Sequence, residues 1–172
     1  MRVVMSDAAI TGPCTVVNYG EVEDYFISLS KVGNTVFEDR DYDGYQDVLE
    51  PGIKNVPITL QFAGADGILN NGDPYEFTYR DTTDANGRYA FKTIRPGAYP
   101  AEDDWWRPPH IHFKVARRGY RELTTQMYFE GEALNDVDRI VQNLPEAERV
   151  SVIAKRVDAA SPYVFDIVIA KV

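Results

Sequence analysis

The sequence contains a single cysteine, Cys14, and only two histidines, His110 and His112, among its 172 residues. A lone cysteine excludes an intramolecular disulfide and any metal site built from several thiolates. No histidine lies within residues 1 to 30, so the sequence offers no nearby imidazole that would activate Cys14 as a nucleophile. Cys14 is therefore predicted to be a small, partly buried side chain.

Positive charge and long apolar runs are also scarce. The chain has 18 Lys+Arg against 27 Asp+Glu, giving a formal net charge of −9, and no basic run is longer than two residues. This charge pattern lacks the electrostatic footprint of a nucleic-acid-binding protein, so we expect no nucleic-acid partner. No run of about 18 apolar residues is present, and "MRVVMSDAAITG" lacks the apolar core of a signal peptide. We therefore expect no membrane partner, and the sequence shows no targeting signal.

Short runs rich in β-branched and aromatic residues follow one another, separated by Gly, Pro, Asn and Asp; examples are "VPITLQF", "HIHFKVA" and "YVFDIVIAKV". Their alternation and spacing predict an all-β fold, an antiparallel β-sandwich. The segment "NDVDRIVQNLPEAERV" has apolar residues at helical spacing and predicts one short helix, capped by Asn135 or Asp136. Asn86-Gly87, between "YEFTYRD" and "RYAFKTI", predicts a tight hairpin.

The segment "DRDYDGYQDVLE", residues 39–50, has the spacing of a calcium-binding loop. Carboxylates occupy the first, third, fifth, ninth and twelfth positions, Gly44 permits a sharp turn at the sixth, and the seventh contributes a backbone carbonyl. The predicted Ca²⁺ ligands are Asp39, Asp41, Asp43, Tyr45, Asp47 and Glu50. Because the flanking sequences look like strands, we expect a structural Ca²⁺ rather than a helix-loop-helix sensor. A solvated acidic turn is the alternative.

The two histidines are separated by one isoleucine in a predicted strand. Residues two apart on a strand project to the same face, so His110 and His112 place two imidazoles side by side. Transition metals bind imidazole readily, which makes the pair a candidate metal site, although paired histidines also occur on surfaces without metal. The preceding "WWRPP" brings Trp105, Trp106 and Arg107 next to the pair, where they could wall a site for a flat aromatic anion. Core filling is the alternative role for the tryptophans.

Three segments, "TDANGRYAFKTIRPGAYP", "WRPPHIHFKV" and "LTTQMYFEGEALNDVD", resemble the intradiol aromatic-ring dioxygenases in order and spacing. The resemblance runs from about Val56 to the C-terminus. It implies a β-sandwich with non-haem Fe(III) bound by two tyrosinates and two histidines. It further implies insertion of both atoms of O₂ into a catechol-type ring, giving a cis,cis-muconate-type diacid. The implied partners are a small aromatic diol and O₂. Many relatives form homodimers, but the sequence does not fix the oligomeric state of this chain, so a homodimer is left open.

Transferred residue by residue, the resemblance implies the iron ligands Tyr99, His110 and His112. Arg107 matches the arginine that stabilises charge on the ring, and Gln126 matches a polar residue behind the site, so both are expected to be catalytic. Trp105 and Trp106 are expected to contact the substrate.

The first tyrosine ligand of the family has no counterpart, because the corresponding position holds Leu69, which cannot bind iron. Tyr75 or Tyr79 is the alternative source of the missing ligand.

The N-terminal part carries two further resemblances. Residues 18–29, "NYGEVEDYFISL", resemble the closing strand of GEVED domains, and "VGNTVFEDRDYDGYQDVLEPGIKNVPITL" resembles the calcium-binding B-type repeats of SdrD-like surface proteins. We therefore expect residues 1–31 to be the end of a GEVED domain and residues 32–172 to form the β-sandwich with its calcium loop at 39–50. The parent architecture looks like a secreted or extracellular bacterial protein, of which this chain is a C-terminal part. A simple acidic surface strand is the alternative for the tail.

Three functions are open on the sequence alone. The first is an Fe(III)-dependent intradiol dioxygenase; the second is a non-catalytic β-sandwich binding or structural module of a secreted bacterial protein, with its iron site degraded at Leu69. The third is a surface zinc or copper site on the same histidines. Packing alone gives no reason to keep Tyr99, Arg107, Gln126 and the histidines together, and this favours the enzyme.

Overall fold

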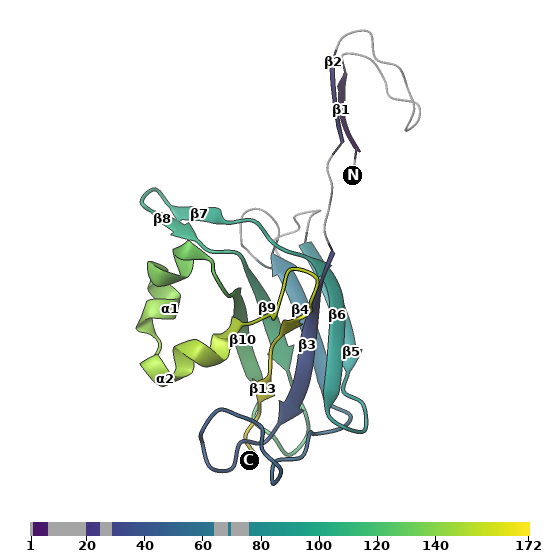
Figure 1. Ribbon diagram of the computed structural model, residues 1–172, viewed down its shortest axis with the longest axis vertical. Helices are drawn as coiled ribbons and strands as arrows, with labels where there is room; N and C mark the ends of the chain where they lie inside the picture. Colours follow the sequence, from purple (N-terminus) through teal and green to yellow (C-terminus); the bar gives the residue numbers. More distant parts are fainter. Residues whose placement is uncertain (1, 7–19, 25–28, 64–68, 70–75) are drawn as a thin grey trace.

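The computed structural model describes residues 2–6, 20–24, 29–63, 69 and 76–172. Most strands belong to two sheets (Figure 1). The five-stranded sheet has the order β11-β10-β9-β4-β5, formed by β4 (Pro57–Ala63), β5 (Glu76–Thr82), β9 (His110–Val115), β10 (Leu123–Phe129) and β11 (Ile153–Ala154). The four-stranded sheet is centred on β3 (Leu29–Phe37), which pairs with β6 (Arg88–Ile94), β12 (Tyr163–Val164) and β13 (Ile167–Val168).

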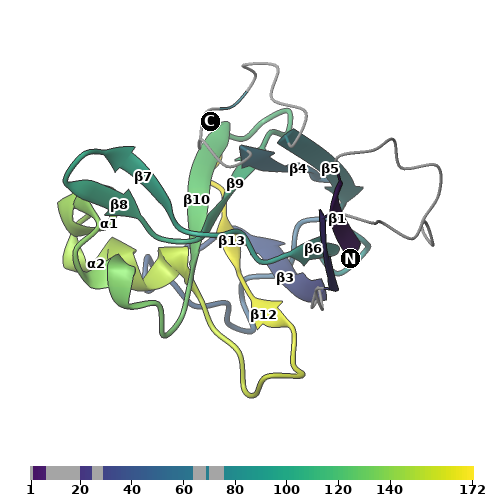
Figure 2. The ribbon, with the colours of Figure 1, turned by 90° about the horizontal axis from the view of Figure 1, so that it is seen from above.

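The two sheets bury one hydrophobic core between them, and Figure 2 shows them on opposite sides of it. Leu60 and Phe113 from the five-stranded sheet are 0% exposed, and they belong to the same cluster as Val32, Tyr89 and Phe91 from the other sheet. The rings of Tyr89, Phe91 and Phe113 meet edge to face, with centroids 5.9 to 6.2 Å apart. The mostly β fold predicted from the alternation is thus confirmed. Because successive side chains on a strand alternate, the outer face of the five-stranded sheet is left for other side chains.

The helical segment differs from the single predicted helix. It contains α1 (Arg139–Asn143) and α2 (Glu146–Arg149), preceded and followed by the short 3₁₀ helices η1 (Ala133–Asp136) and η2 (Val150–Val152). The cap of α1 is Asp138 rather than Asn135 or Asp136, because Asp138 Oδ1 accepts hydrogen bonds from the backbone N–H groups of Ile140 (3.1 Å) and Val141 (2.9 Å). Pro145 separates α1 from α2 since it holds the preceding residue in an extended conformation.

Two predicted pairings are also corrected. The β10–β11, β3–β12 and β3–β13 pairs are parallel, so the fold is not purely antiparallel. Parallel neighbours need a crossover, and the helical segment supplies the one between β10 and β11. The Asn-Gly turn forms, with Gly87 N–H donating to Asp84 C=O at 3.1 Å, but the strands flanking it do not make a hairpin. β5 pairs with β4 and β6 with β3, so this turn carries the chain from one sheet to the other.

The N-terminal strands β1 (Arg2–Ser6) and β2 (Gly20–Asp24) pair with each other in a separate two-stranded antiparallel sheet, and the GEVED sequence is β2 itself. The predicted boundary between residues 31 and 32 falls inside β3, which pairs with β6 from Leu29 onward. The body that contains the two large sheets therefore begins at Leu29 or before. Among the described residues, no helix has the length and apolar character needed to cross a membrane.

Candidate active site

The two histidines project from the outer face of the five-stranded sheet. They lie on β9, where the alternating residues Ile111 and Phe113 are buried in the core between the sheets. The imidazole centroids of His110 and His112 are 5.1 Å apart. The predicted side-by-side arrangement of the two rings is therefore present.

Neighbouring strands add polar side chains to the same face. On β10, Tyr128 is the partner of His110 and Gln126 the partner of His112, while Gln61 on β4 also pairs with His112. Residues directly opposite in a sheet share a face, so these five side chains lie on one surface. The ring centroids of His110 and Tyr128 are 5.7 Å apart.

A hairpin brings the third predicted iron ligand to the histidines. The strands β7 (Tyr99–Glu102) and β8 (Trp105–Arg107) pair so that Tyr99 lies opposite Arg107. The ring centroids of Tyr99 and His110 are 5.7 Å apart. A cavity of about 10 Å³ is lined by Phe62, Ala63, Pro96, Gly97, Tyr99, His110 and His112. That volume is close to the space of one water-sized sphere, so the three predicted ligands surround a space suited to a single small species.

Both imidazoles are held in the neutral form that binds metals. His110 Nδ1 lies 2.8 Å from the carbonyl oxygen of Pro108, which can only accept, so Nδ1 carries the proton and Nε2 keeps its lone pair. Burial lowers the pKa of His110 to about 4, against the opposing effect of the Pro108 hydrogen bond. Burial, and then the charge of Arg107, lowers the pKa of His112. The His112 Nε2 is buried and has no hydrogen-bond partner among the described residues.

These shifts predict that the metal-free protein loses stability as the pH falls below the ordinary histidine pKa. Between about 6.5, where His110 titrates in the unfolded chain, and about 4, where it titrates in the folded protein, only the unfolded state binds the proton. The free energy of unfolding should therefore fall by about 1.4 kcal/mol per pH unit from this group. Urea denaturation at about pH 7 and about pH 5 measures the difference, and His110→Gln should flatten it. If the free energy of unfolding changed equally with pH in the wild type and in His110→Gln, this would contradict a neutral, buried His110.

Arg107 is locked beside the histidines by three hydrogen bonds. Its Nε donates to Asp138 Oδ2 at 2.7 Å, and one of its terminal nitrogens donates to Gln126 Oε1 at 2.7 Å and to the Tyr128 hydroxyl at 2.8 Å. Tyr128 in turn donates to Gln126 Oε1 at 2.6 Å, and burial raises the pKa of Tyr128, which keeps this phenol protonated. Arg107 is only 5% exposed and Asp138 0% exposed. The guanidinium therefore has a fixed orientation.

Two members of this network were not predicted. Tyr128 follows Gln126 by two residues on one strand, and this spacing was a signal that the two share a face. Asp138 gave no comparable signal, because its place beside Arg107 depends on where α1 begins.

The tryptophans lie beside the histidine cavity rather than in its lining, and their predicted contact with a substrate stays a prediction. The Trp105 ring packs against two guanidinium groups, that of Arg107 at 5.5 Å and that of Arg139 at 5.1 Å from a ring centroid. Trp106, the next residue on β8, is 52% exposed. Neither tryptophan lines the cavity beside the histidines.

The alternative sources of a fourth ligand are only partly described. Leu69 lies in a turn and is partly buried, whereas Tyr75 lies outside the described residues. Tyr79 pairs with Leu60, a core residue, so it projects from the face of the sheet opposite to that of His112. The structure therefore does not bring Tyr79 to the histidines, and the hypothesis that it replaces the missing ligand is contradicted by the strand register.

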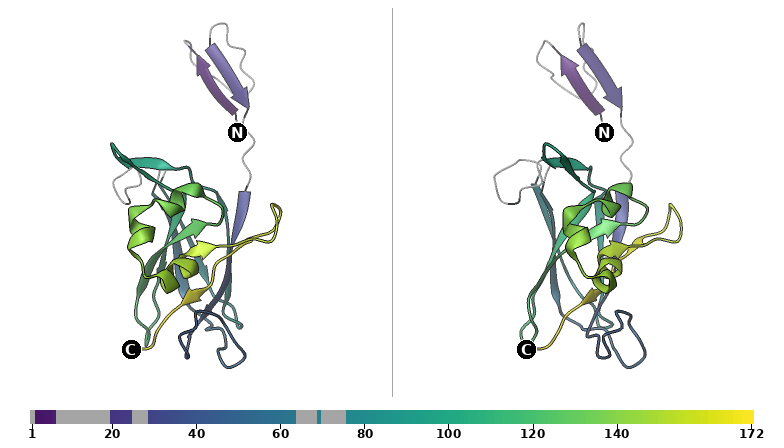
Figure 3. Two further views of the ribbon diagram at one scale, coloured as in Figure 1. Left: turned by 60° about the vertical axis from the view of Figure 1, so that its left-hand side comes forward. Right: turned by 90° about the vertical axis from the view of Figure 1, so that its left-hand side faces the viewer.

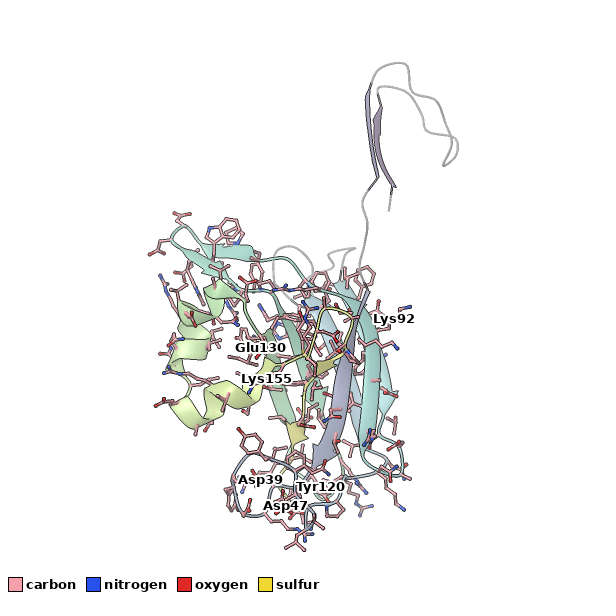
Figure 4. The ribbon with its side chains drawn as sticks, in the orientation of Figure 1. Asp39, Asp47, Lys92, Tyr120, Glu130 and Lys155 are labelled. Atoms are coloured by element: carbon pink, nitrogen blue, oxygen red, sulfur yellow. The ribbon has the colours of Figure 1, made fainter. Side chains whose placement is uncertain are left out.

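The acidic loop lies at the other end of the molecule from the β7–β8 hairpin, and Figure 4 labels two of its residues, Asp39 and Asp47. Carboxylate oxygens of Asp39, Asp41 and Asp43 lie within 4.8 Å of one another. Glu50 is 2% exposed and accepts hydrogen bonds from the backbone N–H groups of Arg40 and Asp47. Gly44 has φ +82°, as the sharp turn requires. The structure thus gathers three of the predicted calcium ligands and places the Tyr45 side chain outward, 69% exposed.

Residues 63–171 match the sequence family described as Dioxygenase. The chain is 48% identical over 79 residues to the protocatechuate 3,4-dioxygenase beta chain of Burkholderia cepacia, covering 44% of this chain and 34% of that one. It is 30% identical over 141 residues to a chlorocatechol 1,2-dioxygenase of Pseudomonas putida, covering 66% and 54%. The chain therefore spans between a third and about half the length of these relatives.

A solved structure shares the fold along nearly the whole chain. The dioxygenase domain of a dioxygenase carbohydrate-binding protein fusion from Streptomyces sp. SirexAA-E superposes with a TM-score of 0.61 at 22% identity, covering 99% of this chain and 98% of that one. The chain is also 40% identical over 78 residues to serine-aspartate repeat-containing protein F of Staphylococcus epidermidis, but this covers only 4% of that protein. This match covers 45% of the present chain but so small a part of the other protein that it gives only weak support to the predicted likeness to B-type repeats.

Proposed function

Because the chain belongs to the intradiol dioxygenase family, as the family match over residues 63–171 shows, we propose that it cleaves a catechol-type ring. The reaction inserts both atoms of O₂ between the two hydroxyl-bearing carbons and gives a cis,cis-muconate-type diacid. The observation that carries the proposal is the convergence of Tyr99, His110 and His112 on one small cavity, beside the buried Arg107.

The side chains present fit ferric iron with one exception. His110 and His112 are neutral imidazoles, the Nε2 of His112 has no hydrogen-bond partner among the described residues, and Tyr99 supplies a hard phenolic oxygen. When bound, ferric iron supplies Lewis acidity, which favours the deprotonated form of a catechol. The exception is the first tyrosine of the family, for which the resemblance offers Leu69 in this chain. Leu69 favours the second candidate function, a non-catalytic binding or structural module of a secreted bacterial protein.

Arg107 stabilises negative charge on the ring of a bound catechol. A guanidinium is always ionised at physiological pH, and here it is buried, so its field is weakly screened. A fixed positive charge that needs no reorganisation during the reaction lowers the energy of an anionic transition state. Gln126 and Tyr128 keep the guanidinium in place from the β10 side of the site.

Turnover of catechol under ¹⁸O₂ by the iron-loaded protein tests the proposal. We expect a ring-opened diacid that carries two labelled oxygen atoms. Resorcinol is the control substrate, because its hydroxyl groups are not adjacent and cannot both bind one metal. A protein that holds iron and leaves catechol intact would favour the non-catalytic module instead.

We also propose that the loop at residues 39–50 binds a structural Ca²⁺, on the basis of its ligand spacing and its three clustered aspartates. Ca²⁺ at about 100 times its dissociation constant should then stabilise the wild type by about 2.7 kcal/mol. Asp43→Ala is expected to lose this gain, while retaining most of the stability seen with chelator. Melting temperatures with Ca²⁺ and with chelator measure both effects. Asp158→Ala, which alters an exposed turn elsewhere, is the control, and an unchanged calcium response in Asp43→Ala would remove Ca²⁺ from the account.

A further inference from the structure

The carboxylate of Asp138 connects the buried guanidinium of Arg107 to the start of α1. One oxygen, Oδ2, accepts from Arg107 Nε at 2.7 Å, while the other, Oδ1, accepts from the backbone N–H groups of Ile140 and Val141. Both oxygens are therefore engaged, and the whole residue is 0% exposed. The direction of the Arg107 side chain and the first turn of α1 are thus set by a single group.

The residue after Asp138 holds the hairpin that carries Arg107. Arg139 makes ion pairs with Glu102 at 2.7 Å and with Asp104 at 3.2 Å, and its guanidinium lies over the Trp105 ring. Figure 3 shows the β7–β8 hairpin lying next to the helical segment in both views. Tyr99 begins β7 and Arg107 ends β8, and the two residues pair with each other. The beginning of α1 is therefore fixed to the hairpin that carries two of the predicted site residues.

We propose that Asp138 is a positioning residue for ring cleavage, acting through Arg107. The inference rests on the proposed function and adds to it a group that does not touch the substrate. Asp138 fixes the guanidinium at Nε, and Gln126 and Tyr128 fix it at a terminal nitrogen. Two separate points of attachment determine both the position and the tilt of the planar group. With the Nε contact removed, the guanidinium can pivot about the remaining one.

Charge balance gives a second reason for the ion pair between Arg107 and Asp138. Arg107 lies beside two imidazoles that would hold a metal cation, and an uncompensated guanidinium there would repel it. The Asp138 carboxylate lies in direct contact with Arg107 and neutralises it at long range. At short range the N–H edge of the guanidinium can still stabilise negative charge that develops on a bound ring.

Asp138→Asn tests the inference with little change in shape. Asparagine is as good a helix cap as aspartate, so α1 should form, but the neutral amide no longer pairs with Arg107. We expect kcat for catechol to fall about 10-fold to 100-fold, with KM and bound iron nearly unchanged. A purely structural role would lower activity only in proportion to the folded fraction. Asp166→Asn is the matched control, because Asp166 is a partly buried carboxylate that accepts from Asn34 and Thr35 in the other sheet. An unchanged kcat in folded, iron-loaded Asp138→Asn would overturn the inference.

A measurement on the metal-free protein separates this inference from the proposed function. The Arg107 Nε proton should exchange slowly with solvent in the wild type and at least about 10-fold faster in Asp138→Asn, as followed by ¹⁵N NMR. This result is expected even if the protein cleaves no catechol, whereas equally slow exchange in both proteins would refute the positioning role. If Asp138→Asn does not fold, Asp138→Glu keeps the charge but displaces the carboxylate by one methylene. The same loss of kcat without a change in KM is then expected, and wild-type kcat would refute the role.

Discussion

His112→Ala is expected to abolish ferric iron binding while the fold stays intact. His112 is one of the three predicted ligands Tyr99, His110 and His112, and its Nε2 is buried without a hydrogen-bond partner among the described residues. Changes to groups that merely support metal ligands cost about 10-fold to 100-fold in affinity, so loss of a ligand should cost at least about 100-fold. The side chain projects away from the core of Phe113 and its neighbours, so the packing between the sheets is not disturbed. Iron content after loading and desalting measures the effect.

Lys114→Ala is the control for this substitution. Lys114 lies two residues further along β9, on the same face of the sheet, and pairs with Glu122 at 3.0 Å on the surface. It should retain the iron of the wild type. Equal iron content in His112→Ala and Lys114→Ala, with both proteins folded, would show that the histidine pair is not the iron site.

Arg107→Lys is expected to reduce kcat/KM for catechol by about 100-fold to 1,000-fold, the range seen when a preorganised donor is removed from an active site. Lysine keeps the positive charge but cannot reproduce the planar fork that contacts Asp138, Gln126 and Tyr128 at once. The charge would then be held less rigidly, and further from the ring. Iron content should be unchanged, because Arg107 is not a ligand. Steady-state kinetics of the iron-loaded variant measure the loss.

Arg117→Lys controls for the general effect of replacing arginine. Arg117 also packs on an aromatic ring, that of Tyr120 at 5.4 Å, but it follows β9 and does not belong to the cluster around the histidines. Its kinetic constants should equal those of the wild type. If Arg107→Lys matched Arg117→Lys in activity, the stabilising role of the Arg107 guanidinium would be refuted.

Much of the fold could be predicted because strand alternation is a local property. The period of two in "HIHFKVA" correctly places both imidazoles on one face, and the same reasoning predicts that Gln126 and Tyr128 share a face. The pairing of strands is not local. The Asn86-Gly87 turn has the sequence of a hairpin, yet β6 pairs with β3, a strand distant in the sequence, and not with β5, so the turn connects two sheets.

The residues of the candidate site could be predicted where a resemblance supplied them. They could be predicted less well where contacts between distant elements decide which side chains lie in the site. Tyr99, Arg107, His110, His112 and Gln126 were all named from their segments, and the fold brings them together. The role of Asp138 could not be predicted, because its partner Arg107 lies 31 residues earlier in the chain and on a different element. The segment "WWRPP" does not show that the guanidinium groups of Arg107 and Arg139 lie over Trp105, because Arg139 comes from another element; substrate contact by the tryptophans stays a prediction. The calcium loop, the GEVED likeness, a homodimer and an extracellular parent protein stay predictions.

The visible absorption spectrum of the iron-loaded protein, before and after addition of catechol, tests the central claim most directly. A phenolate bound to ferric iron absorbs in the visible region, so binding through Tyr99, His110 and His112 predicts a coloured protein whose band shifts when catechol is added. The rise of a muconate absorbance in the near ultraviolet should follow. A colourless protein that retains no iron under the same conditions would contradict the account and leave the chain as a binding or structural module with a dioxygenase fold.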